Sequence, residues 1–406
     1  MSVQCPVPVI QPPNRYDASV SWLQVASHLD PKFGGIAASL PMFCEAAEAE
    51  GVRSPTVSFC GIEEFSAAAP RHDTTCVPAG RLRWMFDPRL RGSMSRAIRK
   101  SDGVHIHGIW EAHCTVAAGL ARACRRPYVL SAHGMLERWA LQHKRLKKAL
   151  YAALIETDNL RRASCLRALT RAEVDDYRRI GLTNPVAIVP GGVSVPANVC
   201  SAGFLEAHPQ LRGKRIVLFL GRLHQKKGLT LLVDAWARCA SSFRDAHLVL
   251  AGPDFDGTRA ALERRVDELG LSSQVTFAGM LDGPTKWSAL TAASVFVLPS
   301  FSEGFSVAVL EALGIGTPVI VTRPCNIPEV GETGCGWVIE PEERAVEGAL
   351  EESLRSSGIE LKRMGDKGRA LVERRFTWSV VGKQMVEVYE WLQGGSRPAS
   401  VQTFPA

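Results

Sequence analysis

The sequence predicts an α/β protein built from two doubly wound domains. At 406 residues the chain exceeds the length of one ordinary hydrophobic core, so two domains are expected. Short, continuously apolar segments of strand length alternate with helical segments, which is typical of parallel sheets covered by helices on both faces. The alternation runs twice, with a break near residues 193–213.

The first series consists of apolar strands, several of which end at glycine. We expect these strands at 19–27, 55–60, 103–108, 127–134, 165–170 and 185–192, with a helix over 36–50 after the first of them. Residues 61–90 are rich in Gly, Pro and Arg, and their pattern assigns no element.

The second series restarts the same alternation. Its strands are expected at 215–222, 246–252, 274–279, 294–300 and 317–322, and its helices at 228–242, 258–270, 284–293 and 305–315. The predicted boundaries are 1–18 for a loose N-terminal tail, 19–200 for the first domain, 201–376 for the second domain, 377–393 for a C-terminal helix that could cross back to the first domain, and 394–406 for a loose tail.

In doubly wound sheets, ligands bind where the carboxyl ends of the strands open into a crevice. One candidate loop, "GRLHQKKG" (221–228), directly follows the first strand of the second domain. Gly221 allows a tight turn, and Arg222, Lys226 and Lys227 bring three cations to the start of a helix, where amide groups and the helix dipole favour a diphosphate. The alternative is a solvated basic loop. The Walker A spacing is absent.

Two glutamates stand in the stretch "FSEGFSVAVLEALGIGTPVIVT" (301–322). Glu303 follows a strand and precedes a helix, so its carboxylate can lie at the mouth of the helix N-terminus. Glu311 lies about two turns into that helix and can accept hydrogen bonds from a vicinal diol such as a ribose. The alternative is a helix-capping Glu303 and an unrelated surface acid at 311.

These two stretches together resemble the retaining glycosyltransferases of family four, which have the GT-B fold. Glu303 and Glu311 match the E-x7-E pattern of that family. In the first domain, "SHLDPKFGGIAASL", "VHIHGIW", "SAHGMLERWALQHKRLKKALY" and "VAIVPGGV" are similar to the family's landmarks in the same order. The resemblance covers about residues 20–392 and implies two Rossmann-like domains facing each other across a cleft, an acceptor domain first and a nucleotide-sugar donor domain second.

The resemblance also implies roles for individual residues. Arg222 and Lys227 would bind the donor diphosphate with Gly221 in their loop, Glu303 would hold hydroxyls of the donor sugar, and Glu311 would bind the ribose. The remaining implied donor-site residues are Gly34 and Gly35 near the phosphates, His133 beside the transferred sugar, and Gly304, Phe305 and Ser306 at sugar or phosphate. Gly191 departs from the family, whose members often carry Asn there, which leaves the acceptor side unassigned.

The implied activity is transfer of a hexosyl-type unit from a nucleoside-diphosphate sugar to a glycan, a lipid-linked or a small polar acceptor, with anomeric configuration retained, in cell-surface polysaccharide or lipopolysaccharide biosynthesis. Same-face transfer, with the cations stabilising the departing diphosphate, is preferred over a Glu303 nucleophile. The alternatives are a sugar-nucleotide epimerase on the same fold, which needs acid–base carboxylates, and a catalytically silent nucleotide-sugar-binding protein.

We expect no metal or other cofactor. Asp254 and Asp256 form a D-x-D pair, but a turn with a capping Asp explains them better than a metal site. The histidines at 105, 107, 113 and 133 lack the spacing of a zinc site, and structural or substrate-contact roles are expected for them instead. The 11 cysteines form no C-x-x-C pair, which favours a reducing compartment.

The charge distribution suggests an anionic partner or, as the alternative, a solubilising basic surface. The formal net charge is +7, and residues 1–200 hold 25 Lys and Arg against 17 Asp and Glu. The basic helical pattern over 137–150 suggests peripheral contact with an anionic membrane, or else an ordinary core helix with a solvated face. With no signal peptide or apolar run of about 20 residues, the expected location is the cytoplasm, or peripheral on the inner face of the cytoplasmic membrane. No nucleic-acid partner is expected.

Overall fold

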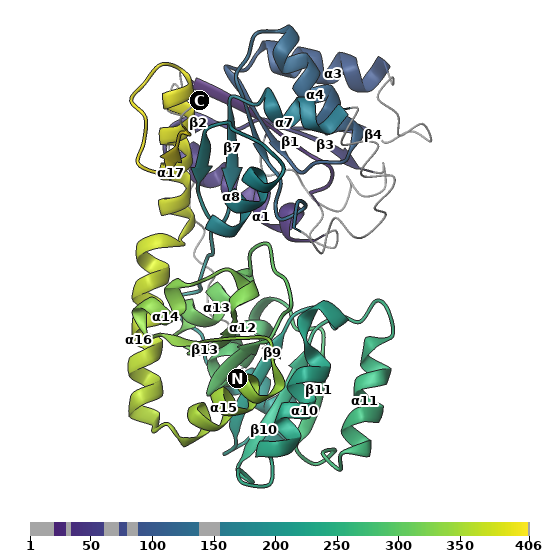
Figure 1. Cartoon of the computed structure of the whole chain (residues 1–406), viewed down its shortest axis with the longest axis vertical. Coiled ribbons are helices and arrows are strands. Elements are labelled where there is room, and N and C mark those ends of the chain that lie inside the picture. The colour runs from purple at the N-terminus through teal and green to yellow at the C-terminus, as the bar shows by residue number, and fades with distance from the viewer. Residues whose placement is uncertain (1–19, 30–33, 61–72, 79–87, 138–154, 405–406) are drawn as a thin grey trace, which may run out of the picture. The chain divides into compact units, whose positions relative to one another are not determined.

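The computed structural model describes residues 20–29, 34–60, 73–78, 88–137 and 155–404 (Figure 1). Two largely parallel sheets, each accompanied by helices, confirm the predicted α/β class with two doubly wound domains. The predicted loose tail over 1–18 lies outside the described residues, as does the predicted basic helix apart from Glu137. Among the described residues, none of the helices has both the length and the apolar character of a membrane span.

The first sheet contains nine strands within the described part of the chain. Their order is β15-β8-β7-β6-β5-β1-β3-β4, with β2 beside β1. The strands are β1 (Val20–Ala26), β2 (Val52–Arg53), β3 (Thr56–Cys60), β4 (Thr74–Pro78), β5 (Gly103–His107), β6 (Tyr128–Ser131), β7 (Cys165–Ala168), β8 (Val186–Ile188) and β15 (Val401–Gln402). The accompanying helices are α1 (Gly35–Ala49), α3 (Pro88–Arg99), α4 (Ala112–Ala123), α7 (Thr157–Arg161), α8 (Arg171–Arg179) and α17 (Trp378–Leu392).

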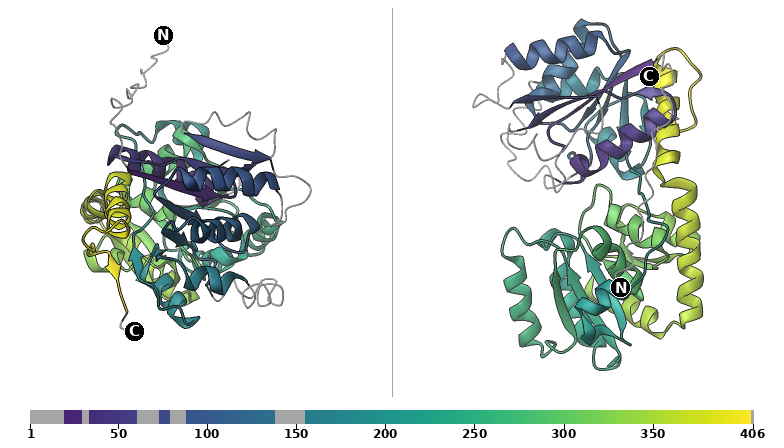
Figure 2. Two further views of the ribbon diagram at one scale, coloured as in Figure 1. Left: turned by 90° about the horizontal axis from the view of Figure 1, so that it is seen from above. Right: turned by 180° about the vertical axis from the view of Figure 1, so that it is seen from behind.

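The second sheet contains six strands within the described residues, in the order β11-β10-β9-β12-β13-β14. They are β9 (Arg215–Leu220), β10 (Ala246–Ala251), β11 (Val275–Gly279), β12 (Val295–Leu298), β13 (Val319–Thr322) and β14 (Gly336–Ile339), and helices lie on both sides of them (Figure 2). The helical segments are α9 (Ala202–Ala207), η3 (Pro209–Leu211), η4 (Gln225–Lys227), α10 (Leu229–Cys239), α11 (Thr258–Glu268), α12 (Gly283–Ala292), α13 (Val307–Ile315), η5 (Arg323–Cys325), α14 (Glu329–Thr333), α15 (Glu343–Arg355) and α16 (Gly358–Arg375).

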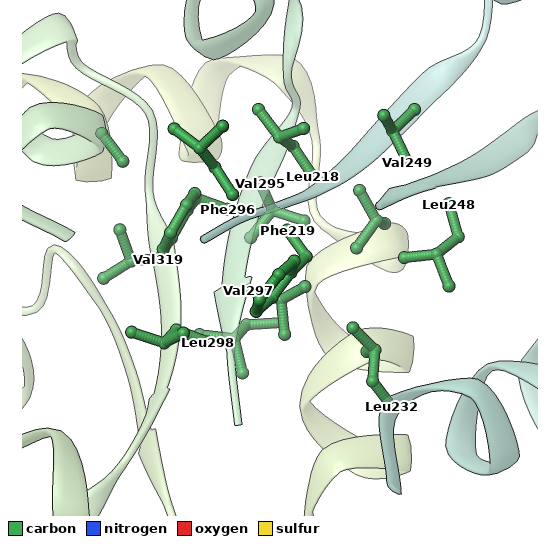
Figure 3. Close-up of a cluster of buried hydrophobic side chains, with 14 of the residues drawn as sticks. Leu218, Phe219, Leu232, Leu248, Val249, Val295, Phe296, Val297, Leu298 and Val319 are labelled. Atoms are coloured by element: carbon green, nitrogen blue, oxygen red, sulfur yellow. The ribbon is translucent and has the colours of Figure 1, made fainter. Parts of the chain in front are cut away.

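The core of the second sheet explains why its strands read as continuous apolar runs. Leu218 of β9 pairs in register with Phe296 of β12, and both side chains are fully buried (Figure 3). Because helices cover both faces of this sheet, its central strands are mostly apolar, and the buried His247 of β10 is hydrogen-bonded to Thr276. Fully burying one apolar side chain contributes roughly 1.5–3 kcal/mol, so these strands fix the positions of the loops that follow them.

The described chain divides into two compact units. The first comprises residues up to 131 with 162–165 and 382–399, and the second comprises 132–161, 166–381 and 400–406. Within the first unit, the Tyr389 ring of α17 stacks on the Trp22 ring of β1 with centroids 4.1 Å apart. The Tyr389 hydroxyl also lies 2.7 Å from Nδ1 of His105. The C-terminal half of α17 is therefore built into the first unit.

Two parts of the sequence prediction need correction or completion. The tail predicted as loose over 394–406 contains β15, which pairs antiparallel with β8 through Val401 and Ala187. Backbone pairing with an existing sheet edge, which a two-residue segment cannot signal by periodicity, orders this segment. The stretch over 61–90 that the pattern left unassigned holds β4 and the start of α3 within its described residues.

Candidate functional site

The loop after β9 is a cationic turn fixed against a neighbouring strand end. His224 caps the 3-10 turn η4, because its Nδ1 accepts the N–H of Lys226 at 3.0 Å. Gly228 ends the turn in the left-handed region, with φ of +67°, and a Cβ there would lie 2.1 Å from the Pro299 carbonyl oxygen. Only glycine fits this position, so the loop is held close to the end of β12.

Glu303 lies in the loop between β12 and α13 and is nearly buried, with 8% of its surface exposed. Its Oε1 lies 2.7 Å from Nζ of Lys227 and accepts the Ser300 hydroxyl at 2.5 Å. Its backbone carbonyl accepts Asn326 Nδ2 at 2.6 Å, and its own N–H donates to Pro324 O at 2.9 Å. The carboxylate is thus oriented by fixed partners beside the cationic turn.

Glu311 lies on α13 and pairs with a lysine of the neighbouring helix. Lys286 Nζ of α12 is 2.5 Å from Glu311 Oε1. Burial raises the pKa of the Glu311 carboxyl, and the Lys286 charge opposes this rise. Glu311 is therefore a mostly buried, ion-paired acid and not the surface acid of the alternative interpretation. The spacing of the two glutamates gave no signal for Lys286.

Arg222 is exposed and, among the described residues, makes no hydrogen bond or ion pair. Gly221 before it is anchored, because its N–H donates to Ala251 O at 3.0 Å and a Cβ at Gly252 would lie 1.8 Å from the Gly221 carbonyl oxygen. Lys227 contacts Glu303, whereas no hydrogen bond or ion pair joins Arg222 to Glu303 in the part of the chain that the structure describes. Arg222 is thus an exposed guanidinium at the edge of the cationic turn.

His133 follows β6 in a turn that packs against the loop of Glu303. Its φ is +52°, which is uncommon for a residue other than glycine. The next residue, Gly134, has φ of +74°, and a Cβ there would lie 2.8 Å from the Cα of Gly304. Burial lowers the pKa of His133 to about 3, and the Arg167 charge acts in the same direction. The imidazole is therefore neutral near neutral pH.

The other predicted donor-site residues are placed as follows. Gly304 faces the turn of Gly134, and the Phe305 ring covers Gly191, where a Cβ would lie 2.8 Å from the ring. A larger residue at 191 would collide with Phe305, which accounts for the glycine at this departure from the family pattern. Ser306 is buried at the N-cap of α13.

Gly34 and Gly35 lie in the first unit, at the exposed N-terminal end of α1. Gly34 is the N-cap residue, with φ of +115°. Their predicted place near the donor phosphates stays a prediction.

Asp254 and Asp256 act as turn residues. Asp254 Oδ1 accepts the backbone N–H of Gly257 at 3.1 Å, and Asp256 Oδ1 accepts the Thr258 hydroxyl at 2.6 Å. In the described ranges, no group of three or more His, Cys, Asp or Glu side chains is arranged to hold a metal ion.

The structure adds residues that sequence reasoning missed. Glu137 accepts a hydrogen bond from the Ser302 hydroxyl, and its Oε2 lies 3.6 Å from Nζ of Lys226. Ser300 and Asn326 orient Glu303 as described above. Ser300 ends the predicted strand "SVFVLPS", which is a weak signal, whereas nothing in the sequence marked Glu137.

Comparisons with known proteins identify the family and the fold. Residues 205–371 match the model for glycosyl transferases group 1, and residues 34–192 match the model for a glycosyl transferase 4-like domain. A phosphatidyl-myo-inositol mannosyltransferase from Mycobacterium tuberculosis is 31% identical over 222 residues, covering 52% of this chain and 56% of the relative. The chain thus spans about half the length of this relative. An alpha-D-kanosaminyltransferase from Streptomyces kanamyceticus is 25% identical and covers 76% of this chain and 81% of the relative.

Among solved structures, HepE of Anabaena in complex with UDP and glucose has a TM-score of 0.73 at 18% identity. The superposition covers 92% of this chain and all of HepE. At this identity the likeness shows the fold. One family model covers most strands of the first sheet and the other covers the six described strands of the second sheet, and the chain therefore belongs to the group 1, GT4-type glycosyltransferases with the GT-B fold.

Proposed function

We propose that this chain is a retaining glycosyltransferase that moves a sugar from a nucleoside-diphosphate sugar to an acceptor hydroxyl. The observation that carries the proposal is the Lys227–Glu303 pair at 2.7 Å, with the Ser300 hydroxyl on the same carboxylate oxygen. A cation for the diphosphate and a carboxylate for sugar hydroxyls lie within one hydrogen bond of each other. The donor binds to both groups, with its diphosphate on the Lys227 amine and its sugar hydroxyls on the Glu303 carboxylate.

Each side chain has a defined task in this reaction. Lys227 and the exposed Arg222 bind the diphosphate and stabilise the charge that develops as it leaves. Glu303 accepts hydrogen bonds from the sugar, and Glu311 from the ribose. The acceptor oxygen attacks the anomeric carbon on the face that the diphosphate leaves, and the acceptor proton passes to the departing phosphate oxygen. One C–O bond breaks and one forms on the same face of the sugar, so the configuration is retained. Gly304, Phe305 and Ser306 follow Glu303 in the same loop and contact the sugar or the phosphate. His133 lies beside the sugar.

The acceptor is a glycan, a lipid-linked sugar or a small polar molecule, in cell-surface polysaccharide biosynthesis. The mycobacterial relative is named as a phosphatidyl-myo-inositol mannosyltransferase, which makes lipid-linked acceptors the first class to test. The excess of positive charge in residues 1–200 supports peripheral binding to an anionic membrane on the cytoplasmic side. No metal is required, so transfer in the presence of EDTA should equal transfer in its absence.

The testing experiment incubates the protein with UDP-, GDP- and ADP-sugars and a panel of acceptors, followed by mass spectrometry and by NMR of the anomeric proton. Free nucleoside diphosphate with a glycosylated product of retained configuration supports the proposal. An altered sugar nucleotide would mean an epimerase, and saturable binding without turnover would mean a binding protein. An inverted product would overturn the retaining mechanism alone.

A further inference from the structure

The turn over residues 132–137 is attached to one face of α8. The Ala132 N–H donates to the Tyr177 hydroxyl at 3.3 Å, and the Gly134 N–H donates to Glu173 Oε1 at 2.8 Å. Glu173 and Tyr177 are four residues apart on α8, so they lie on the same face of the helix. Both are buried. The two anchored amides flank His133 on either side.

Both carboxylate oxygens of Glu173 accept hydrogen bonds from backbone N–H groups, and these groups belong to two different segments of the chain. It is the third residue of α8, and its N–H donates to the capping Thr170 hydroxyl at 3.3 Å. In a capping box the acid at this position bonds the N–H of the capping residue itself. Here one oxygen reaches Gly134, and the other accepts the Leu169 N–H at 2.7 Å. The Glu173 side chain therefore ties the turn to the end of β7, whereas the Thr170 hydroxyl caps the helix.

The Gly134 amide that Glu173 holds belongs to the peptide group that follows His133. Its direction sets the ψ angle of His133, whose φ of +52° is already unfavourable for a residue with a side chain. Such a backbone conformation persists only where surrounding contacts impose it. The same turn contacts Gly304, because a Cβ at Gly134 would lie 2.8 Å from the Gly304 Cα. The orientation of this peptide therefore affects both His133 and the loop that carries Glu303.

We propose that Glu173 is a positioning residue for sugar transfer, holding the His133–Gly134 peptide in the orientation that places His133 and the neighbouring Gly304 loop for the donor sugar. The inference rests on the proposed function for the identity of the ligand. That Glu173 fixes the turn follows from its buried hydrogen bonds to the Gly134 and Leu169 amides and does not depend on the ligand.

Protonation should weaken this hold near neutral pH. Burial raises the pKa of Glu173 to about 7, while the two backbone N–H groups and the Arg167 charge lower it and the Glu137 charge raises it. His133, in the turn that Glu173 holds, is neutral in this range because burial lowers its pKa to about 3. A protonated carboxyl donates through one oxygen and can no longer accept both N–H groups. Sugar transfer should therefore fall as the pH drops through about 7.

Hydrogen–deuterium exchange of the full-length protein tests the hold without reference to activity. In Glu173→Gln, the isosteric amide accepts at only one oxygen, so we expect the Gly134 or Leu169 amide to exchange about tenfold faster, the effect of one lost buried hydrogen bond. Glu360→Gln is the matched control, because Glu360 is the third residue of α16 in an exposed capping box with Ser357. It should leave residues 132–137 unchanged. Tyr177→Phe provides a second variant, with faster exchange at Ala132.

Kinetics then test the consequence for transfer. Glu173→Gln should lower kcat more than it raises KM, and the acidic limb near pH 7 in the wild-type profile should disappear. Wild-type exchange at both Gly134 and Leu169 in Glu173→Gln overturns the inference, and so does faster exchange with unchanged kcat and an unchanged pH profile. If the wild type transfers no sugar, the proposed function fails instead, and the exchange result alone decides whether Glu173 holds the turn.

Discussion

Lys227 Nζ and Glu303 Oε1 lie 2.7 Å apart, although 76 residues separate them in the chain. The two loops that carry them are also joined by the backbone, since the Phe301 N–H donates to Lys226 O at 2.9 Å. Each loop follows a strand, and β9 and β12 are neighbours in the second sheet. The carboxyl ends of adjacent parallel strands meet at one edge, so the sheet order brings the amine to the acid.

Lys227→Ala should reduce kcat/KM for the donor about 10²–10³-fold, the cost of one lost donor to developing charge. The nucleoside diphosphate should bind more weakly as well. Steady-state kinetics and calorimetry with the diphosphate measure the two effects. Lys362→Ala is the control, since Lys362 is exposed and pairs only with Asp366 on its own helix in the described structure. Equal kinetics for Lys227→Ala and Lys362→Ala would exclude Lys227 from leaving-group stabilisation.

Arg222→Ala should leave the folded state intact and still lower kcat. The side chain is exposed and unpaired among the described residues, so its removal breaks no contact there. The melting temperature should stay within about 1 °C of wild type, as expected for a surface change worth less than about 0.5 kcal/mol. A large fall in melting temperature would show that the guanidinium has a structural role instead. Unchanged kcat would remove Arg222 from the site.

Glu303→Gln and Glu311→Gln should change different kinetic constants. The first removes the acid that meets the sugar and leaves Lys227 without its partner, so kcat should fall while the diphosphate still binds. The second removes the partner of Lys286 and the predicted ribose acceptor, so KM and the diphosphate Kd should rise with a smaller change in kcat. Titrating each variant with the nucleoside diphosphate and with the complete donor distinguishes them. The reverse pattern would exchange the roles of the two acids.

The sequence predicts the strands of the second sheet well because the central strands are buried on both faces and are therefore mostly apolar. Glu303 and Lys227 could be identified as candidate site residues for the same reason, because charged residues that directly follow an apolar strand are easily recognised in the sequence. The edge strands of the two sheets gave a weaker signal in the sequence. β14 has four residues that are only half-buried, and β15 has two residues, so neither forms a long, fully buried apolar run.

Contacts that depend on how helices and turns pack could not be predicted. Lys286 meets Glu311 because α12 and α13 lie side by side, and the spacing within either helix does not encode that neighbour. Glu173 is an ordinary capping acid by its position after Thr170. Its second partner, Gly134, is 39 residues away and belongs to a turn whose shape comes from the sheet and from α8. The basic pattern over 137–150 lies almost wholly outside the described residues, so its membrane role stays a prediction.

Gly228→Ala should destabilise the protein and distort the cationic turn, in contrast to Gly213→Ala. Both glycines have positive φ, at +67° and +75°, so alanine at either position incurs the left-handed penalty of about 1–2 kcal/mol. Gly213 has open space around its Cβ position, whereas a Cβ at Gly228 would lie 2.1 Å from the Pro299 carbonyl oxygen. The loop must therefore move away from β12 in Gly228→Ala, and Lys227 moves with it. Urea denaturation should show a larger loss of stability for Gly228→Ala than for Gly213→Ala, and only Gly228→Ala should weaken diphosphate binding. Equal effects of the two variants on binding would mean that the close approach at Pro299 does not hold Lys227 in place.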